Sequence, residues 1–281
     1  MNWQAEGSKD WGRLSRRLQT TDPSLQILVL AAHPDDETIG ASVLLSRFPQ
    51  SSVVFLTDGA PRDTRLWSAG VHGSREDYAE TRRQEALDAL KYVNIPAEQV
   101  VWLGAVDQES AFEIGTLAER FGNVITETRP EIVITHAYEG GHPDHDAASL
   151  AVSVACGLIE ARGGSVPAII EMTGYHADGR GLATGVFLPS QHPVTTLTLT
   201  AVDRLRKKRM IDCFASQREL LAGFAVETES FREAPQYDFR EPPPRGAVHY
   251  ERLGWKINGA LWRQQTRLAL DRLGSPACPR G

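Results

Sequence analysis

The sequence predicts an α/β fold in which a Rossmann-like, mainly parallel sheet is flanked by helices. Short apolar runs alternate with longer amphipathic stretches through the first half of the chain, as expected of a parallel sheet covered on both faces by helices. The 281 residues, of which 41% are hydrophobic and 23% charged, have the composition of a folded globular protein. We therefore expect one large domain with additions.

Each apolar run predicts a buried strand and each amphipathic stretch predicts a helix. The expected strands are residues 27–32, 52–57, 100–103, 132–136, 168–172 and 194–200. The expected helices are residues 76–93, 111–128, 201–224 and 258–273, with Thr200 or Asp203 near the cap of the third. Several prolines in residues 233–246 exclude a central strand there and indicate an ordered surface loop.

These elements divide the chain into three consecutive parts. Residues 1–25 form an N-terminal extension, residues 26–225 form the α/β domain, and residues 226–281 form a loop and helix packed on the same domain. A basic cluster at residues 204–209 has helical spacing, which indicates a solvated helix face.

The charge and cysteine content exclude several classes of protein. The net charge is -6, from 36 acidic and 30 basic residues, and the basic residues are scattered, so we expect no nucleic-acid partner. Cys156, Cys213 and Cys278 are odd in number and far apart, which argues against a disulfide framework or a cysteine-based metal site. No apolar run approaches the ~20 residues of a membrane span. The sequence predicts a cytoplasmic protein and fixes no oligomeric state.

A first polar cluster, Ala32-His33-Pro34-Asp35-Asp36-Glu37, follows the first predicted strand. Ligand sites in open parallel sheets form at the carboxyl ends of strands. Because His33 and Asp36 are three residues apart, a tight turn entering a helix can direct both side chains to one point, and Pro34 suits the first turn of a helix. An imidazole and a carboxylate are ligands that suit Zn²⁺.

A second cluster follows the fourth predicted strand and consists of His136 and then residues 140–146. It places His142 and His145 three residues apart in a Pro-containing turn. The two clusters would emerge from the same edge of the sheet and supply three protein ligands with an open position for water. The alternative is that each cluster only begins a helix, where Pro and Asp are common. Two such turns, both after buried strands, favour the metal site.

On these motifs the sequence resembles the LmbE-like, or PIG-L, family of zinc-dependent N-deacetylases. Members have a His-Pro-Asp-Asp turn after the first strand and a later His-Pro-Asp-His, and both are present here unaltered. The resemblance spans most of residues 26–220, and it also covers residues 82–87, 103–104, 129–133 and 216–217. It implies the LmbE-like form of the Rossmann-like fold.

Carried over position by position, the resemblance implies that His33, Asp36 and His145 bind one Zn²⁺ per chain, or another divalent metal in its place. Asp35 is then the general base, which takes a proton from the metal-activated water and later gives it to the leaving amine.

The resemblance also implies roles around the ligands. His142 would stabilise the oxyanion as an imidazolium, with Asp144 as its orienting partner. Arg82 matches a position that contacts sugar hydroxyls, although a salt bridge on the helix surface explains it equally well. Asp107, just after the third strand, is a further candidate for binding a polyol substrate.

The function implied is a Zn-dependent hydrolase that removes an N-acetyl group from an N-acetylglucosamine-type sugar or a related small molecule. One alternative is an amidase that acts on another amide, such as a conjugate or a glycosylated natural product. The other is a non-catalytic Rossmann-like binding module. Against this module, the first strand is followed by His-Pro-Asp-Asp and not by the Gly-x-Gly-x-x-Gly turn that binds a pyrophosphate.

Overall fold

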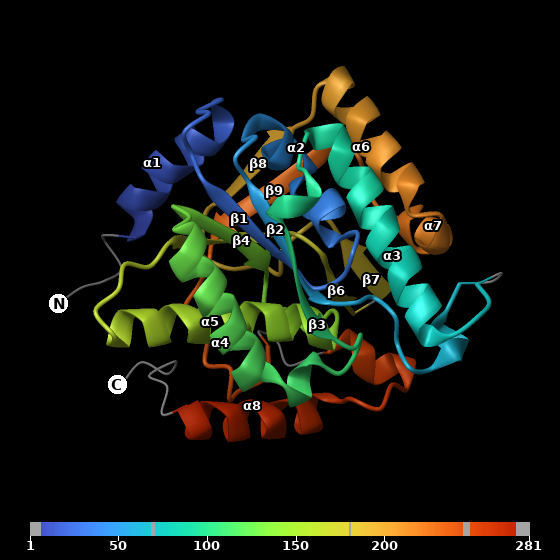
Figure 1. The fold of residues 1–281 in the computed structure, drawn as a ribbon. Coiled ribbons are helices and arrows are strands. Elements are labelled where there is room, and N and C mark those ends of the chain that lie inside the picture. The colour runs from blue at the N-terminus through green and yellow to red at the C-terminus, as the bar shows by residue number, and fades with distance from the viewer. Residues whose placement is uncertain (1–6, 69–70, 180, 244–247, 274–281) are drawn as a thin grey trace.

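A seven-stranded sheet lies at the centre of the molecule (Figure 1). The structure is a computed structural model that describes residues 7–68, 71–179, 181–243 and 248–273. Cys278 and part of the loop predicted at residues 233–246 lie outside the described residues. The strand order is β3-β2-β1-β4-β5-β9-β8, with β1 to β5 parallel and the last two strands antiparallel to their neighbours. The predicted mainly parallel α/β fold is confirmed.

The strands of the central sheet are short and mostly buried. They are β1 (Ile27–Ala31), β2 (Ser52–Thr57), β3 (Val100–Ala105), β4 (Ile132–His136), β5 (Ala168–Met172), β8 (Val194–Thr198) and β9 (Thr228–Glu233). A separate hairpin consists of β6 (Tyr175–Asp178) and β7 (Gly181–Thr184).

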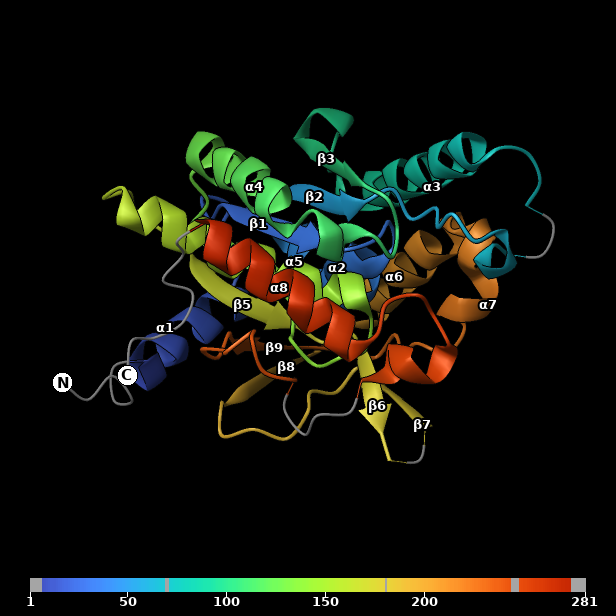
Figure 2. The same ribbon diagram turned by 90° about the horizontal axis from the view of Figure 1, so that it is seen from below.

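Helices cover both faces of the sheet (Figures 1 and 2). One face carries α1 (Gly7–Gln19), α2 (Asp36–Arg47), α3 (Arg75–Leu90) and α6 (Ala201–Cys213), and the other carries α4 (Ile114–Thr128), α5 (Pro143–Ala161) and α8 (Gly259–Leu273). Successive side chains of a strand point to opposite faces. Val29 therefore joins the first core cluster, whereas Leu28 and Leu30 join the second.

Short helical segments complete the connections between these elements. They are α7 (Arg218–Leu221) and the 3-10 helices Thr64–Leu66, Lys91–Val93, Ala97–Gln99, Ser110–Phe112, Ala215–Gln217 and His249–Leu253. Within the described ranges, no helix has the length and apolar character needed to cross a membrane.

The helix predicted at residues 201–224 is interrupted, so that prediction was wrong in its extent. The chain leaves α6 at Phe214, which has φ -86° and ψ 64° and is fully buried. The backbone N–H and the hydroxyl of Ser216 then donate to Glu85 at 2.8 and 2.6 Å. The break therefore lets the core take up Phe214 and brings Ser216 to a buried carboxylate of α3.

The basic cluster at residues 204–209 is not wholly solvated, which corrects a second prediction. Lys207 is only 1% exposed, and its Nζ donates to Glu229 of β9 at 2.8 Å and to the carbonyl oxygen of Ile39 at 2.6 Å. A buried ammonium group is tolerated because both partners are present. Arg204 and Lys208 of the same helix remain exposed, as predicted.

Candidate metal centre

The two predicted turns meet at the carboxyl ends of adjacent strands. β1 and β4 pair in parallel, with Val29 opposite Ile134. The first turn leads from β1 into α2, and the second leads from β4 into α5. The two turns therefore face each other across the point where the strand order reverses direction, which is the usual place for a ligand in such sheets.

His33, Asp36 and His145 lie together at this point. His33 Nδ1 is 3.2 Å from Asp36 Oδ2, and His145 Nε2 is 3.3 Å from Asp36 Oδ1. One donor atom from each residue lies within 4.8 Å of the other two, and both imidazoles are buried. Two imidazole nitrogens and one carboxylate form a donor set for a catalytic zinc site with an open position. The residues present therefore fit a divalent cation.

Asp144 holds the far side of the first imidazole. Its Oδ2 is 3.2 Å from His33 Nε2, and the fully buried carboxylate also accepts from the backbone N–H of Gln108 at 2.6 Å and from the hydroxyl of Ser110. Burial acts to raise the pKa of Asp144, but the hydrogen bonds from His33 and Ser110 hold that pKa below its ordinary value. A carboxylate on the second nitrogen of a ligand histidine fixes its tautomer and orientation.

His142 precedes α5 and caps it. Its Nδ1 accepts from the backbone N–H of Asp144 at 3.2 Å, so this nitrogen is unprotonated and Nε2 carries the hydrogen. Burial and the neighbouring His33 also keep the pKa of His142 well below its ordinary value. The geometry supports a neutral donor in place of the expected imidazolium. The backbone of Asp144 orients His142, while the Asp144 carboxylate lies 3.8 Å from His142 Nδ1 and closer to His33.

Asp35 lies beside the donor set and has its own partner. Its Oδ2 accepts from Arg82 Nη2 at 2.8 Å, and the Arg82 side chain is only 2% exposed. Burial raises the pKa of Asp35 to about 6, against the opposing charge of Arg82. A carboxylate poised near neutrality suits a general base. The guanidinium of Arg82 therefore turns inward to Asp35 and does not lie on the helix surface.

Asp107 faces the same cluster from the loop after β3. Its Oδ1 is 3.4 Å from His33 Nε2 and 3.9 Å from His142 Nε2, and this atom is buried without a hydrogen-bond partner within the described part of the chain. His33, Asp107, His142 and Asp144 form a second group whose donor atoms all lie within 4.8 Å. The Asp107 carboxylate thus lies beside His33 and His142 in this second group.

Two residues of the centre were given no role from the sequence. His136, the last residue of β4, stacks on His145 with ring centroids 4.0 Å apart, and its Nε2 accepts from the backbone N–H of Ala32 at 3.0 Å. Glu37 is fully buried, and burial raises its pKa to about 8. For each residue the sequence offers one indication of a place in the centre. His136 ends β4, and Glu37 directly follows Asp36.

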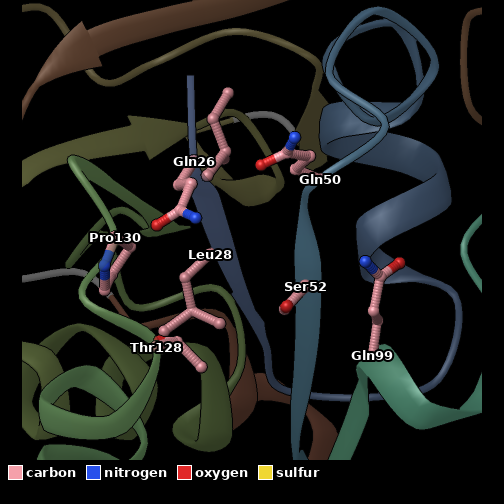
Figure 3. A pocket seen from close by; sticks show the side chains of 8 residues that line it. Gln26, Leu28, Gln50, Ser52, Gln99, Thr128 and Pro130 are labelled. Carbon is pink, nitrogen blue, oxygen red and sulfur yellow. The ribbon is translucent and has the colours of Figure 1, made fainter. Parts of the chain in front are cut away.

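A hollow at the opposite ends of the strands differs from the metal centre in the side chains that line it (Figure 3). It has a volume of about 340 Å³ and lies at the amino ends of β1 and β2. Its lining residues are Gln26, Ile27, Leu28, Gln50, Ser52, Gln99, Thr128 and Pro130. None of these side chains is charged, and none is a histidine or cysteine, so the hollow offers no acid, base or metal ligand.

The fold and the centre together define a class: a Rossmann-like α/β protein with a His/Asp metal-binding cluster at the carboxyl edge of its sheet. Residues 28–156 match the family described as PIG-L: GlcNAc-PI de-N-acetylase. This match confirms the resemblance to the PIG-L, or LmbE-like, family that was seen in the two turns.

Curated relatives named as a deacetylase and as an amidase are similar to part of the chain. One is a probable N-acetyl-α-D-glucosaminyl L-malate deacetylase 2 of Bacillus subtilis, 30% identical over 130 residues that cover 45% of this chain and 58% of the relative. Another is a mycothiol S-conjugate amidase of Streptomyces coelicolor, 26% identical over 144 residues that cover 43% and 48%. The chain thus matches about half the length of the curated relatives.

Solved structures share the fold over a larger part of the chain. A deacetylase from the teicoplanin biosynthesis pathway has a TM-score of 0.55 and 18% identity over 74% of this chain and 96% of its own. The 4-carboxy-2-hydroxymuconate hydratase of Pseudomonas putida has a TM-score of 0.51 and 17% identity over 74% and 95%. Because one fold supports both reactions, the fold alone does not assign the chemistry.

Proposed function

We propose that this chain is a metal-dependent N-deacetylase that removes the acetyl group from an N-acetylglucosamine-type sugar or a related small molecule. The observation that carries the proposal is the convergence of His33, Asp36 and His145 beside the separate carboxylate of Asp35. Similarity to a probable N-acetyl-α-D-glucosaminyl L-malate deacetylase, 30% identical over 130 residues, supports it.

In this proposal His33, Asp36 and His145 hold a divalent cation, for which zinc suits the donor set. When bound, such a cation supplies Lewis acidity, which polarises the acetyl carbonyl and lowers the pKa of a water molecule. The contact of His33 Nε2 with Asp144 at 3.2 Å keeps this imidazole in one tautomer, with Nδ1 free to act as a ligand.

The remaining steps belong to the side chains around this set. Asp35 takes the proton of the attacking water on its carboxylate, and it gives that proton to the nitrogen of the amine as the amide C–N bond breaks. Arg82 keeps the carboxylate in place through the 2.8 Å contact. The Nε2–H of His142 donates to the carbonyl oxygen as negative charge develops there.

Hydrolysis of a different amide is the second candidate, and the similarity to a mycothiol S-conjugate amidase favours it. The same base and the same donor to the carbonyl oxygen would serve both reactions, because each attacks an amide carbonyl. The acyl group released distinguishes them: acetate in the first case and a larger carboxylic acid in the second.

The proposal is tested by measuring acetate release from a panel of N-acetylated sugars, with purified protein and added Zn²⁺. The panel includes N-acetylglucosamine, its inositol and malate conjugates, and N,N'-diacetylchitobiose. We expect acetate from at least one member and none from the Asp35→Asn variant, which should retain its metal. Protein that binds no divalent cation, or an Asp35→Asn variant with full turnover, would contradict the proposal.

A further inference from the structure

The backbone of Asp35 has an unusual conformation, with φ 137° and ψ -28°. Three other described non-glycine residues have positive φ, namely Asn94, Gln108 and Arg129, and theirs lie between 49° and 70°, in the left-handed region. Asp35 lies outside that region, where a residue with a Cβ is disfavoured. Such a conformation persists only where surrounding contacts hold it.

Glu37 supplies one of those contacts from the first turn of α2. Its Oε2 accepts from the backbone N–H of Asp35 at 3.0 Å, and its Oε1 accepts from the hydroxyl of Thr38 at 2.6 Å. The side chain is fully buried, and no basic side chain pairs with it among the described residues. Burial of an unpaired carboxyl group is costly. The hydrogen bonds of Glu37 are nevertheless both to neighbouring residues, and one of them holds the backbone N–H of Asp35.

The other polar groups of Asp35 are held as well. Arg82 Nη2 donates both to Asp35 Oδ2 at 2.8 Å and to the carbonyl oxygen of Pro34 at 2.5 Å. The backbone N–H groups of Thr38 and Ile39 donate to the carbonyl oxygen of Asp35 at 2.9 and 3.0 Å. In this conformation the backbone N–H of Asp35 therefore has Glu37 as its hydrogen-bond partner. Without this hydrogen bond, rotation of φ to a negative value would turn the Asp35 side chain away from the metal centre.

We infer that Glu37 is a positioning residue, which holds the Asp35 backbone so that the Asp35 carboxylate faces the metal centre. The inference rests on the proposed function, in which Asp35 moves the proton. It assigns to Glu37 neither a metal-binding role nor a contact with substrate.

The kinetic test compares Glu37→Ala, which removes the acceptor, with Glu37→Gln, which retains an oxygen in its place. Misplacement of a reacting group by about 1 Å costs on the order of 10²-fold in rate. We therefore expect kcat of Glu37→Ala to fall roughly 10- to 100-fold with KM and metal content kept. Glu37→Gln should restore most of kcat.

Ser42→Ala is the matched control for a loss of stability in the same helix. Ser42 is buried in α2 and donates to Glu229, far from Asp35 in the hydrogen-bond network. We expect this variant to melt at a lower temperature with kcat unchanged.

If Glu37→Ala does not fold, Thr38→Val serves instead, because it removes the hydroxyl that donates to Oε1 of Glu37. For Thr38→Val, a fall in kcat smaller than that expected for Glu37→Ala, with KM unchanged, supports the inference. An unchanged kcat in Thr38→Val overturns it.

A readout independent of activity is the backbone of Asp35 in crystal structures of the metal-free variants. The inference predicts a negative φ at Asp35 in Glu37→Ala and a retained positive φ in Glu37→Gln. A positive φ in both variants, or full kcat in Glu37→Ala, overturns it. Failure of the wild-type protein to hydrolyse any amide would overturn the proposed function, while the φ comparison would still decide what Glu37 does.

Discussion

The two ends of β1 and β2 differ in what lies beside them: a hollow at the amino ends and titratable side chains at the carboxyl ends. The amino ends border a hollow of about 340 Å³ lined by neutral side chains such as Gln50 and Ser52 (Figure 3). The carboxyl end of β1 instead leads into a buried cluster of imidazoles and carboxylates, with His33 and Asp36 in contact at 3.2 Å. Charged groups are costly to bury. Where they converge, they indicate function more strongly than open volume does.

The largest expected effect comes from removing a ligand at the carboxyl edge. His145→Ala deletes one of the three proposed donors, so we expect metal content to fall from about one cation per chain to nearly none. Amide hydrolysis should disappear with it. Elemental analysis after gel filtration checks the metal, and acetate release checks turnover. A variant that keeps its cation would show that His145 is not a ligand.

Asp35→Asn should separate proton transfer from metal binding at the same edge. The amide keeps the shape of the side chain but cannot take a proton, so we expect turnover to fall about 10²- to 10⁴-fold. Metal content should remain that of the wild type. Steady-state rates and elemental analysis measure the two quantities. Loss of the metal in this variant would mean that Asp35 is part of the donor set.

Asp144→Asn should weaken the centre by a smaller factor. Its carboxylate contacts His33 Nε2 at 3.2 Å, and partners of ligand histidines contribute about 10- to 100-fold in metal affinity. We expect a loss of that size in competition titrations against a chelator. Wild-type affinity in the variant would show that His33 needs no orienting carboxylate.

The smallest effect is expected at the amino edge. Gln50 is exposed at the rim of the hollow, and Gln50→Ala removes no titratable or metal-binding group. We expect kcat/KM to change by less than about two-fold and the free energy of unfolding by less than about 0.5 kcal/mol. A loss of activity comparable to that of Asp144→Asn would break the contrast between the two edges.

Sequence alone predicted the parallel half of the sheet because those strands are buried on both faces. Ile27–Ala31 and Ile132–His136 are nearly continuous apolar runs, and such runs carry their own signal. Strand β9 was missed because its inward side chains include Glu229 and Arg232. Their burial depends on Lys207 and Glu171 from distant segments, at 2.8 and 2.7 Å. A pattern of polarity cannot reveal partners so far apart in the chain.

The same distinction applies to the metal centre. The spacing of His33 and Asp36 in one turn was enough to place both on one side, since local geometry decides it. The inward direction of Arg82 depends on contacts between α3 and the turn before α2. The positive φ of Asp35 accompanies a hydrogen bond from its backbone N–H to the buried carboxylate of Glu37. Neither could be predicted from the sequence, because spacing alone shows neither which side chains are buried nor which groups they bond.

The most direct test of the metal centre is a crystal structure of the protein grown with Zn²⁺, with anomalous diffraction measured at the zinc edge. We predict one strong anomalous peak enclosed by His33 Nδ1, Asp36 and His145 Nε2. Zinc found only elsewhere, including among Asp107, His142 and Asp144, with no peak between the three predicted ligands, would contradict the account.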